Sequence, residues 1–451
     1  MVRVPLREAV IAIFAPAPGA LAKGTNNSAT AHCGQSPLLP PSPRRVTHLR
    51  PRRVTRGTLR TALPDLSNTR IAFRQYTDVG LLRAYWLFRF IGVPALNSVG
   101  KVLSEAAIKL HLPIKGIIKA TIFKHFCGGE TIEESLVTAQ KLGDGGLGTI
   151  LDYSVEGQED DDSLDHTTEE ILHTIAMAAK RKDIPFSVFK PSGISPVALL
   201  EAVSEGRALN PEETREWALV QQRFTRICTA AAEADIPVLV DAEESWIQLA
   251  IDDLAERMME RFNRARAIVY NTVQLYRHDR LAYLKAAEQR AAAKGYHLGL
   301  KLVRGAYMEK ERARAEEKGY PSPIHADKAA VDRDYDAALH YCADRLGHLA
   351  VMVGTHNEQS TLLMAKLMQE RGLPANDPRV CFAQLLGMSD NISYNMADAG
   401  FRVAKYVPYG PVREVLPYLI RRAQENTSAA GQMGRELKMI VAERARRKRE
   451  K

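Results

Sequence analysis

The sequence predicts an α/β fold, a (βα)8 TIM-like barrel preceded by a helical extension and a disordered basic leader. From about residue 130 onward, short apolar runs alternate with longer helical segments, as in parallel strands joined by helices. Eight such runs occur between residues 129 and 436, and a barrel of this kind typically needs about 250 residues. Most of the runs also end in polar residues, which is where an enzyme barrel carries its chemistry.

The expected leader covers residues 1–70 and is strongly basic. Its first 64 residues contain nine Arg, one Lys and a single acid, Glu8, and so account for the whole formal charge of +9. A basic, acid-poor segment rich in Ser, Thr and Pro is typical of a mitochondrial targeting peptide. A disordered arm that binds nucleic acid or lipid is the alternative. The near-neutral remainder of the chain offers no basic patch to continue such an arm, so we expect no nucleic-acid partner.

A helical extension is expected over residues 71–128, and a basic C-terminal tail over 437–451. The most apolar stretch, 81–99, is interrupted by Arg83, Arg89 and Pro94, and it falls short of the about 20 unbroken apolar residues that a membrane span needs. This stretch and the segment 102–126 are expected to be amphipathic helices. They could pack against the barrel or lie on a membrane surface.

The barrel itself is expected over residues 129–436. Its strands are expected at 148–153, 186–190, 238–241, 268–274, 298–304, 349–354, 380–382 and 402–406. Its helices are expected at 167–182, 211–234, 246–266, 279–294, 327–346, 359–372, 389–399 and 412–426. A GxGxxG match at Gly143, Gly145 and Gly148 follows a helix and precedes a strand, the reverse of the order that dinucleotide binding requires, so we interpret it as a helix stop. The five cysteines include no CxxC pair and indicate neither a zinc site nor a disulfide framework.

Polar residues gather at the carboxyl ends of the expected strands, and in a barrel the loops at these ends meet over one mouth. Any one of them could be an ordinary strand terminus, but packing alone does not explain the whole set. The set comprises Lys190, Asp241, Gln274, Lys301, Arg304, Thr355, His356, Asn357 and Tyr406.

Lys301 is the least ordinary of these residues. In the strand 298–304, alternation puts Gly299, Lys301 and Val303 on one face. Both faces of a barrel strand are buried, so the Lys301 cation is expected to need an anion or an electron-rich partner. Gly305 and Ala306 follow, and their small size would let a flat ring or a phosphate approach the backbone.

The last expected helix, 412–426, carries a polar stripe. Tyr418, Arg421, Arg422 and Glu425 fall at i, i+3, i+4 and i+7 and therefore line one face. The stripe could be an ordinary solvated face. It could equally be a clamp in which two guanidinium groups hold a carboxylate.

Four strings of residues resemble motifs of the proline dehydrogenase (proline oxidase) family and occur in the same order. The resemblance is to the eukaryotic mitochondrial members of the family. The four strings are LysLeuValArgGlyAlaTyr at 301–307, ThrHisAsn at 355–357, GlnLeuLeuGlyMetSerAsp at 384–390 and TyrLeuIleArgArgAlaGlnGluAsn at 418–426. The resemblance covers residues 129–428, and the last string is highly specific. Many bacterial members carry ArgLeuValLys where this chain has LysLeuValArg. At Lys301 a single ammonium group therefore stands where those members have a planar guanidinium group.

The resemblance implies a barrel that holds FAD without a Rossmann motif, and it implies roles for individual residues. Arg421 and Arg422 would grip the proline carboxylate. Tyr406, Tyr418 and Leu385 would enclose the ring. Lys190 and Asp241 would form a charged pair beneath the substrate. Glu425 would orient an Arg or touch the ribityl chain of the flavin. The FAD contacts would be Gln274, Lys301, Arg304, Gly305, Ala306, Thr355, His356 and Asn357.

The implied activity is oxidation of L-proline to Δ1-pyrroline-5-carboxylate by hydride transfer to the flavin. Electrons would then pass to ubiquinone, at the matrix side of the mitochondrial inner membrane, with which the protein would associate peripherally. A hydroxyproline dehydrogenase on the same scaffold is the alternative, although Tyr406 would crowd a ring hydroxyl. Two alternatives lie outside the proline dehydrogenase class. One is a Schiff-base aldolase that uses Lys190 or Lys301, and the other is a non-enzymatic scaffold with a basic arm.

Overall fold

The computed structural model describes residues 63–91, 119–154, 159–428 and 430–451. Most of the expected leader and most of the segment 102–126 lie outside these ranges. The described part of the chain contains no helix that is long and apolar enough to cross a membrane.

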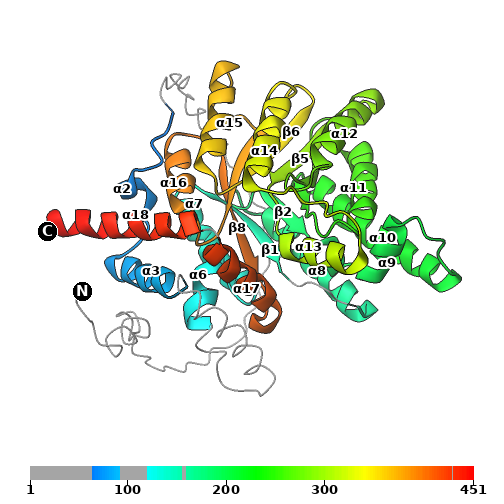
Figure 1. Cartoon of the computed structure of the whole chain (residues 1–451), viewed down its shortest axis with the longest axis horizontal. Coiled ribbons are helices and arrows are strands. Elements are labelled where there is room, and N and C mark those ends of the chain that lie inside the picture. Colours follow the sequence, from blue (N-terminus) through cyan, green and yellow to red (C-terminus); the bar gives the residue numbers. More distant parts are fainter. Residues whose placement is uncertain (1–62, 92–118, 155–158, 429) are drawn as a thin grey trace, which may run out of the picture. The chain divides into compact units, whose positions relative to one another are not determined.

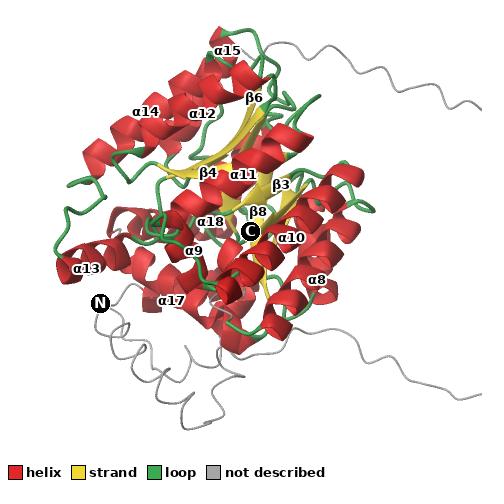
Figure 2. Ribbon diagram, turned by 90° about the vertical axis from the view of Figure 1, so that its right-hand side faces the viewer, coloured by secondary structure: helices red, strands yellow, loops and turns green. Residues whose placement is uncertain are grey.

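Eight parallel strands close into a barrel in sequence order, with β1 paired to β8, which confirms the expected fold class. The yellow strands lie inside a shell of red helices in Figure 2. The strands are β1 (Gly148–Tyr153), β2 (Phe186–Phe189), β3 (Val238–Val240), β4 (Val269–Gln274), β5 (Leu298–Val303), β6 (Leu349–Gly354), β7 (Val380–Leu385) and β8 (Val403–Tyr409).

Strand ends differ from expectation where neighbouring strands continue or stop pairing. β8 runs on to Tyr409 because it stays in register with β1 as far as Tyr153. β2, β3 and β5 end one residue early, so Lys190, Asp241 and Arg304 stand just beyond their strands. These side chains are therefore carried by the first residue of a loop at the barrel mouth.

The helices of the barrel cover its outer face, and all of the expected ones occur. Two short helices, α9 and α13, were not expected, and α8 begins at Asp161 because Asp160 caps it by accepting from the Ser163 amide at 2.9 Å. The helices are α7 (Ile132–Asp144), α8 (Asp161–Ala178), α9 (Val197–Ser204), α10 (Pro211–Glu233), α11 (Gln248–Phe262), α12 (Arg280–Lys294), α13 (Met308–Lys318), α14 (Lys328–Ala343), α15 (Glu358–Glu370), α16 (Asp390–Asp398) and α17 (Val412–Ser428), with the 3-10 turn η2 (Pro191–Gly193) after β2.

The hydrophobic core has two layers. The larger layer lies between the strands and the helices and includes Leu151, Phe224 and Tyr335. The smaller layer fills the barrel and includes Leu239 and Met352, together with Tyr406 near the mouth. Because the interior is packed with side chains, ligands can enter only where the loops beyond the strands leave space.

The extension and the end of the chain pack together beside the barrel. The described extension consists of α2 (Thr69–Ala72), α3 (Asp78–Ile91), a π-helical turn η1 (Lys119–Phe123) and α6 (Lys124–Phe126). Residues 437–451, expected as a basic tail, instead belong mostly to helix α18 (Ala430–Arg449), which lies along α3 (Figure 1). Phe73, Leu81 and Ile440 are buried between these elements, and Arg447 and Lys451 pair with Asp78 of α3 at 3.0 and 2.6 Å. Apolar contacts and ion pairs therefore both hold this helix in place.

Candidate active site

A cavity of about 1010 Å³ opens at the carboxyl ends of the strands. Its volume lies at the upper end of the range for ligand pockets. Fifteen of the sixteen residues predicted for the site line it: Lys190, Asp241, Gln274, Lys301, Arg304, Gly305, Ala306, Thr355, His356, Asn357, Leu385, Tyr406, Tyr418, Arg421 and Arg422. The remaining one, Glu425, lies in α17, and its side chain is outside the described part of the structure.

A buried cluster of charges forms the floor of the cavity. Lys190 Nζ donates to Asp152 Oδ2 at 3.1 Å and to Asp241 Oδ2 at 3.0 Å. Lys301 donates to the other oxygen of Asp241, which also accepts the Tyr406 hydroxyl at 2.6 Å. The anion that Lys301 was expected to need is therefore Asp241, contributed by a different strand. Two carboxylates face two ammonium groups, so the floor is close to neutral.

The two carboxylates of the floor have opposite pKa shifts. Burial raises the pKa of Asp241, but the ammonium groups of Lys301 and Lys190 outweigh burial and leave the pKa below its ordinary value. Burial also raises the pKa of Asp152, and here Lys190 offsets it only in part, so the net pKa is above its ordinary value. Asp241 is consequently the firm anion of the cluster.

Asp152 was missed in the sequence. It lies inside β1 rather than beyond the end of the strand, it is only 1% exposed, and it also accepts the Ser154 hydroxyl at 2.7 Å. The signal in the sequence was a charged residue, Asp152, within an otherwise apolar strand, because a buried charge needs a partner. The same logic had been applied to Lys301 alone.

Three residues of the polar stripe of α17, Tyr418, Arg421 and Arg422, line the cavity. Tyr418 and Arg422 are buried, and Arg422 lies over the Tyr418 ring with its guanidinium carbon 5.2 Å from the ring centroid. Arg421 lies 5.7 Å from the centroid of Tyr307, a further lining residue that the sequence analysis did not single out. These three side chains are therefore not part of an ordinary solvated face, and the clamp stays a prediction.

The wall formed by β5, β6 and α15 is polar. Arg304 donates to the Thr355 hydroxyl at 2.7 Å and to the Ser360 hydroxyl at 3.0 Å, and it pairs with Asp332 at 2.8 Å. Helix α15 starts beside these residues, where Asn357 caps it by accepting from the Ser360 amide at 3.0 Å. A helix N-terminus and a guanidinium group together favour an anionic ligand at this wall.

His356 and Ser389 form a second polar contact on the cavity wall. The His356 Nδ1 atom lies 2.9 Å from the Ser389 hydroxyl oxygen. Burial, reinforced by the charges of Lys405, Arg422 and Arg304, lowers the pKa of His356 to about 3. The imidazole is therefore neutral at physiological pH, and it acts as a hydrogen-bonding group rather than as a cation.

Gly305 has a structural role in addition to the one expected. Its φ is 144°, and a Cβ atom at this position would lie 2.4 Å from the ring of Tyr276. Packing against Tyr276 and the backbone angle therefore require glycine here, whether or not a ligand approaches. Gln274 is also fixed by the protein, since its Nε2 donates to the Glu243 carbonyl at 2.6 Å and its Oε1 accepts from the Ala306 amide at 3.3 Å.

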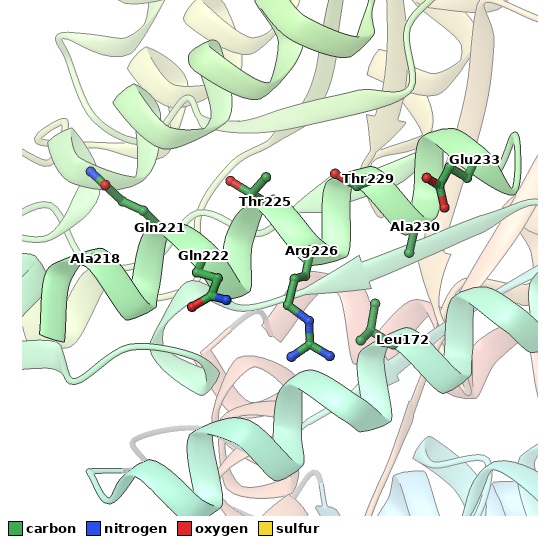
Figure 3. Close-up of a pocket in the computed structure, with 9 residues that line it drawn as sticks. All are labelled: Leu172, Ala218, Gln221, Gln222, Thr225, Arg226, Thr229, Ala230 and Glu233. Atoms are coloured by element: carbon green, nitrogen blue, oxygen red, sulfur yellow. The ribbon is translucent and has the colours of Figure 1, made fainter. Parts of the chain in front are cut away.

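A second hollow of about 590 Å³ lies on the outer surface between α8 and α10 (Figure 3). Leu172 and Ala230 form its apolar part, and Arg226 at its edge pairs with Glu169 at 2.7 Å. None of the residues predicted for chemistry lines it. The barrel mouth is thus the better candidate for the active site.

Fold and site together define a class of protein: a (βα)8-barrel enzyme whose mouth holds two guanidinium groups, a buried charge cluster and a polar wall. The proline dehydrogenase family model matches residues 135–435. The chain belongs to the proline dehydrogenase family, as the four sequence strings indicated.

Curated relatives come from bacteria and eukaryotes. The carbapenem antibiotics biosynthesis protein CarD of Pectobacterium carotovorum subsp. carotovorum is 39% identical over 324 residues, covering 71% of this chain and 83% of that protein. The mitochondrial proline dehydrogenase 1 of Arabidopsis thaliana is 30% identical over 430 residues, covering 84% and 86%. The human mitochondrial proline dehydrogenase 1 is 36% identical over 319 residues, with 70% of this chain but only 49% of the human protein covered.

Solved structures confirm the fold. Proline utilization A (PutA) from Bdellovibrio bacteriovorus, inactivated by N-propargylglycine, superposes with a TM-score of 0.64 at 20% identity and covers 80% of this chain. The match spans 38% of the PutA chain, so this chain corresponds to one part of that larger protein.

Proposed function

We propose that this protein oxidises L-proline to Δ1-pyrroline-5-carboxylate with FAD as its cofactor. Family membership supports the reaction. The observation that carries it here is the inward face of α17, which places Arg421 and Arg422 on the cavity whose floor is the cluster of Asp152, Lys190, Asp241 and Lys301. A small zwitterion with a carboxylate and an amine is the ligand that such a pair of surfaces suits.

Arg421 and Arg422 bind the substrate carboxylate in this proposal. Guanidinium groups suit the task because their planar donors match a carboxylate bidentately and stay charged at any physiological pH. Tyr406, Tyr418 and Leu385 enclose the apolar part of the ring and keep water from it. All three line the cavity, and Tyr406 and Tyr418 are buried.

Lys190 is not the base that takes the amine proton in this proposal. Its ammonium group donates to both Asp152 and Asp241, and two nearby carboxylates favour the protonated form. Lys190 instead fixes the two carboxylates in place beneath the substrate. We therefore expect Lys190→Met to keep a substantial maximal rate at high pH, where the substrate amine is already neutral, and loss of all activity there would reassign the base to Lys190.

The residues of the polar wall fit FAD. The cavity is far larger than proline needs, and Arg304 and the α15 N-terminus suit its diphosphate. When bound, FAD supplies the acceptor for a hydride from the substrate. Lys301 provides positive charge next to the reacting region, held there by Asp241. The proposed FAD contacts are Gln274, Lys301, Arg304, Gly305, Ala306, Thr355, His356 and Asn357, and Glu425 is proposed to orient an Arg or to touch the ribityl chain.

We place the protein at the matrix side of the mitochondrial inner membrane, with ubiquinone as the electron acceptor. The basic leader supports mitochondrial import, and several relatives are named mitochondrial. Peripheral contact would involve α3 or the basic end of α18. Unchanged partition into vesicles of inner-membrane lipid after Lys448 and Arg449 are replaced by Gln would exclude the end of α18.

An absorbance spectrum of the purified protein, followed by anaerobic addition of L-proline, tests the proposed reaction. Flavin bands that bleach with L-proline are the expected result. A yellow protein that L-proline does not bleach would refute the substrate. A colourless protein that FAD cannot reconstitute would refute the cofactor.

L-proline is favoured over hydroxyproline by the position of Tyr406. The residue is 8% exposed, and its hydroxyl is held by Asp241 at 2.6 Å and by Lys301 at 3.3 Å, so the ring cannot easily turn away from the cavity. We expect kcat/KM for L-proline to exceed that for trans-4-hydroxy-L-proline by about tenfold or more, since overpacking costs about 1–3 kcal/mol. Comparable values would favour the alternative substrate.

A further inference from the structure

Glu243 lies two residues beyond Asp241, outside the lining of the cavity, and is 3% exposed. Its carboxylate accepts two hydrogen bonds from a single residue of the neighbouring loop. The Ser192 amide donates to Oε1 at 2.8 Å, and the Ser192 hydroxyl donates to Oε2 at 2.5 Å. Ser192 lies two residues beyond Lys190. The contact therefore joins the loop that carries Lys190 to the loop that carries Asp241.

Ser192 is rigidly linked to Lys190. It lies in the turn η2, which Lys190 caps, and the Gly193 amide donates to the Lys190 carbonyl at 3.0 Å. A shift of Ser192 would therefore move the Lys190 backbone. Because Lys190 must reach two carboxylates at once, a small displacement would break one of its contacts at 3.1 and 3.0 Å.

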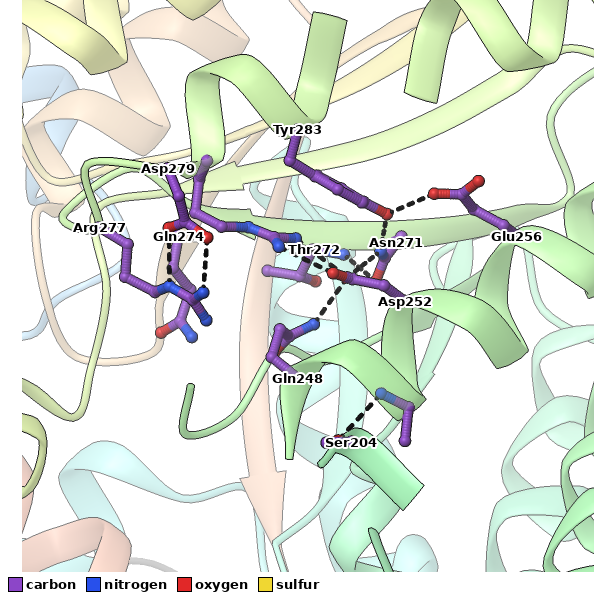
Figure 4. Close-up of polar contacts among 12 residues, drawn as sticks. Ser204, Gln248, Asp252, Glu256, Asn271, Thr272, Gln274, Arg277, Asp279 and Tyr283 are labelled. Carbon is purple, nitrogen blue, oxygen red and sulfur yellow. Dashed lines mark hydrogen bonds and ion pairs between the residues drawn. The ribbon is translucent and has the colours of Figure 1, made fainter. Parts of the chain in front are cut away.

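Glu243 is itself anchored from two sides. Its amide donates to Gln248 Oε1 at 3.0 Å, and its carbonyl accepts from Gln274 Nε2 at 2.6 Å. Gln248 in turn donates to Asp252 at 2.9 Å, as Figure 4 shows. The side chain of Glu243 thus projects from a backbone that the barrel wall holds fixed.

Asp252 is the centre of a buried network behind the barrel wall. Arg280 donates to its two oxygens at 2.7 and 2.9 Å. The Asn271 amide group of β4 donates to it at 2.8 Å (Figure 4). A carboxylate that accepts from several fixed donors cannot turn freely. This network ties the anchor of Glu243 to β4, α11 and α12.

We propose that Glu243 is a positioning residue for Lys190: it holds the loop after β2 against the loop after β3, so that the Lys190 ammonium group stays between Asp152 and Asp241. The proposal rests on the proposed function, because it assigns Glu243 an effect on the substrate site. Glu243 acts only through Lys190. Removing Lys190 should therefore abolish the consequence of removing Glu243.

The structure offers a matched control. Glu311 of α13 accepts from the Ser245 amide at 2.6 Å and from the Ser245 hydroxyl at 2.5 Å, which is the same contact with the same pair of residue types. Glu311 is also fully buried. It ties α13, rather than the loop of Lys190, to the segment that follows β3.

The test is a double-mutant cycle in the full-length FAD-loaded protein. Glu243→Gln is measured in the wild type and in Lys190→Met, by kcat/KM for L-proline and by calorimetric binding of oxolane-2-carboxylate, a proline analogue without the amine. We expect Glu243→Gln to lower kcat/KM and the association constant of the analogue by roughly tenfold in the wild type, which is the range for a hydrogen bond to a charged group. In Lys190→Met the same substitution should lower both by less than about twofold. Glu311→Gln should act by the same factor in both backgrounds.

Equal factors for Glu243→Gln in the two backgrounds would overturn the proposal. If Glu243→Gln does not fold, Ser192→Ala replaces it in the cycle and Ser245→Ala replaces the control. A wild type that L-proline does not reduce would refute the proposed reaction instead, and the calorimetric cycle would still decide the role of Glu243.

Discussion

Asp241 is the residue on which the charge cluster depends. Its two oxygens accept from Lys190 just beyond β2, from Lys301 within β5 and from Tyr406 within β8. Asp152, in contrast, faces Lys190 and its neighbour Ser154. The two carboxylates lie on either side of the same ammonium group, yet they differ in how many partners lose a hydrogen bond when they are replaced.

Asp241→Asn should lower the free energy of unfolding by about 3 kcal/mol at pH 7, because it leaves two buried ammonium groups without their shared anion. Asp152→Asn should cost clearly less, because burial raises the pKa of Asp152 and so its ionised form is less favoured in the folded protein. Urea unfolding monitored by far-UV circular dichroism measures both. An equal loss for the two variants would contradict this assignment.

The pH dependence supplies an independent check on Asp241. A carboxyl group whose folded pKa lies below its unfolded value stabilises the protein fully above the unfolded value, near 3.8, and loses that contribution as pH falls through the folded pKa. The stability difference between wild type and Asp241→Asn should therefore be constant above about pH 5 and shrink below about pH 4. A difference that persists unchanged at pH 3 would contradict the lowered pKa.

At the scale of elements, α17 carries one face into the cavity and another into solvent. Arg422 lies on the buried face, whereas Arg413, one residue beyond the start of the helix, is exposed. Two Arg residues of one helix thus differ in environment, one buried and one exposed, because their side chains point in different directions. This difference provides a control for the proposed carboxylate clamp.

Arg422→Lys should raise KM for L-proline roughly tenfold or more, because a point charge replaces a planar donor pair. Arg413→Lys should leave KM unchanged, since it keeps the charge on an exposed surface. Steady-state kinetics with L-proline measures both. The clamp would be refuted by two variants with the same KM as the wild type.

Helix α18 attaches to the barrel mouth through Glu436, which accepts from the Ser389 amide. Burial, followed by the nearby carboxylate of Asp390, raises its pKa to about 7. The other charged groups that face it are Lys405 and Glu358. Lys405 is entirely buried and pairs with Asp390 at 2.7 Å. Glu436 therefore lies next to an ion pair that already contains one cation and one anion.

Protonated Glu436 should stabilise the folded protein, with the effect lost as pH rises. The ordinary pKa of a Glu carboxyl group is about 4.5, so between pH 4.5 and pH 7 the folded state holds a proton that the unfolded state has released. The free energy of unfolding therefore falls as pH rises through this window. We expect a decrease of about 2 kcal/mol between pH 5 and pH 8 that Glu436→Gln removes. Urea unfolding at the two pH values tests this, and an identical decrease in the variant would exclude Glu436 as its source.

At the scale of the whole molecule, barrel closure brings together residues that lie far apart in the chain. Asp152 on β1 and Tyr406 on β8 share one charge cluster because β1 pairs with β8 in register from Gly148 to Tyr153. The closing contact also brings the start of the barrel next to its last strand. Integrity of the site therefore depends on the whole barrel, and not on a separate lobe.

The leader should be dispensable for the folded enzyme. Leu66 is buried and α2 begins at Thr69, so structure that packs on the barrel begins close to residue 66. We expect a variant that lacks residues 2–60 to keep its melting temperature and its L-proline kinetics, while a fluorescent protein fused to residues 1–60 is imported into mitochondria. Calorimetry, kinetics and microscopy test these points. A fusion that stays in the cytosol would refute the targeting prediction.

The sequence by itself determined the barrel and most of its mouth. Period-two apolar runs and helical spacing are local signals, and a parallel barrel places all carboxyl strand ends at one mouth. The positions of Lys190, Asp241, Arg304 and Thr355 therefore followed from chain order alone.

Only the tertiary structure decided which charges face one another. Asp152 joined the site because β1 packs beside β2, and the stripe of α17 became an inward face because that helix lies over the mouth. α18 packs on α3 through buried apolar contacts between segments at opposite ends of the described chain. Such long-range contacts leave no periodic trace in the sequence, since their energy comes from the burial of surfaces that chain order does not bring together.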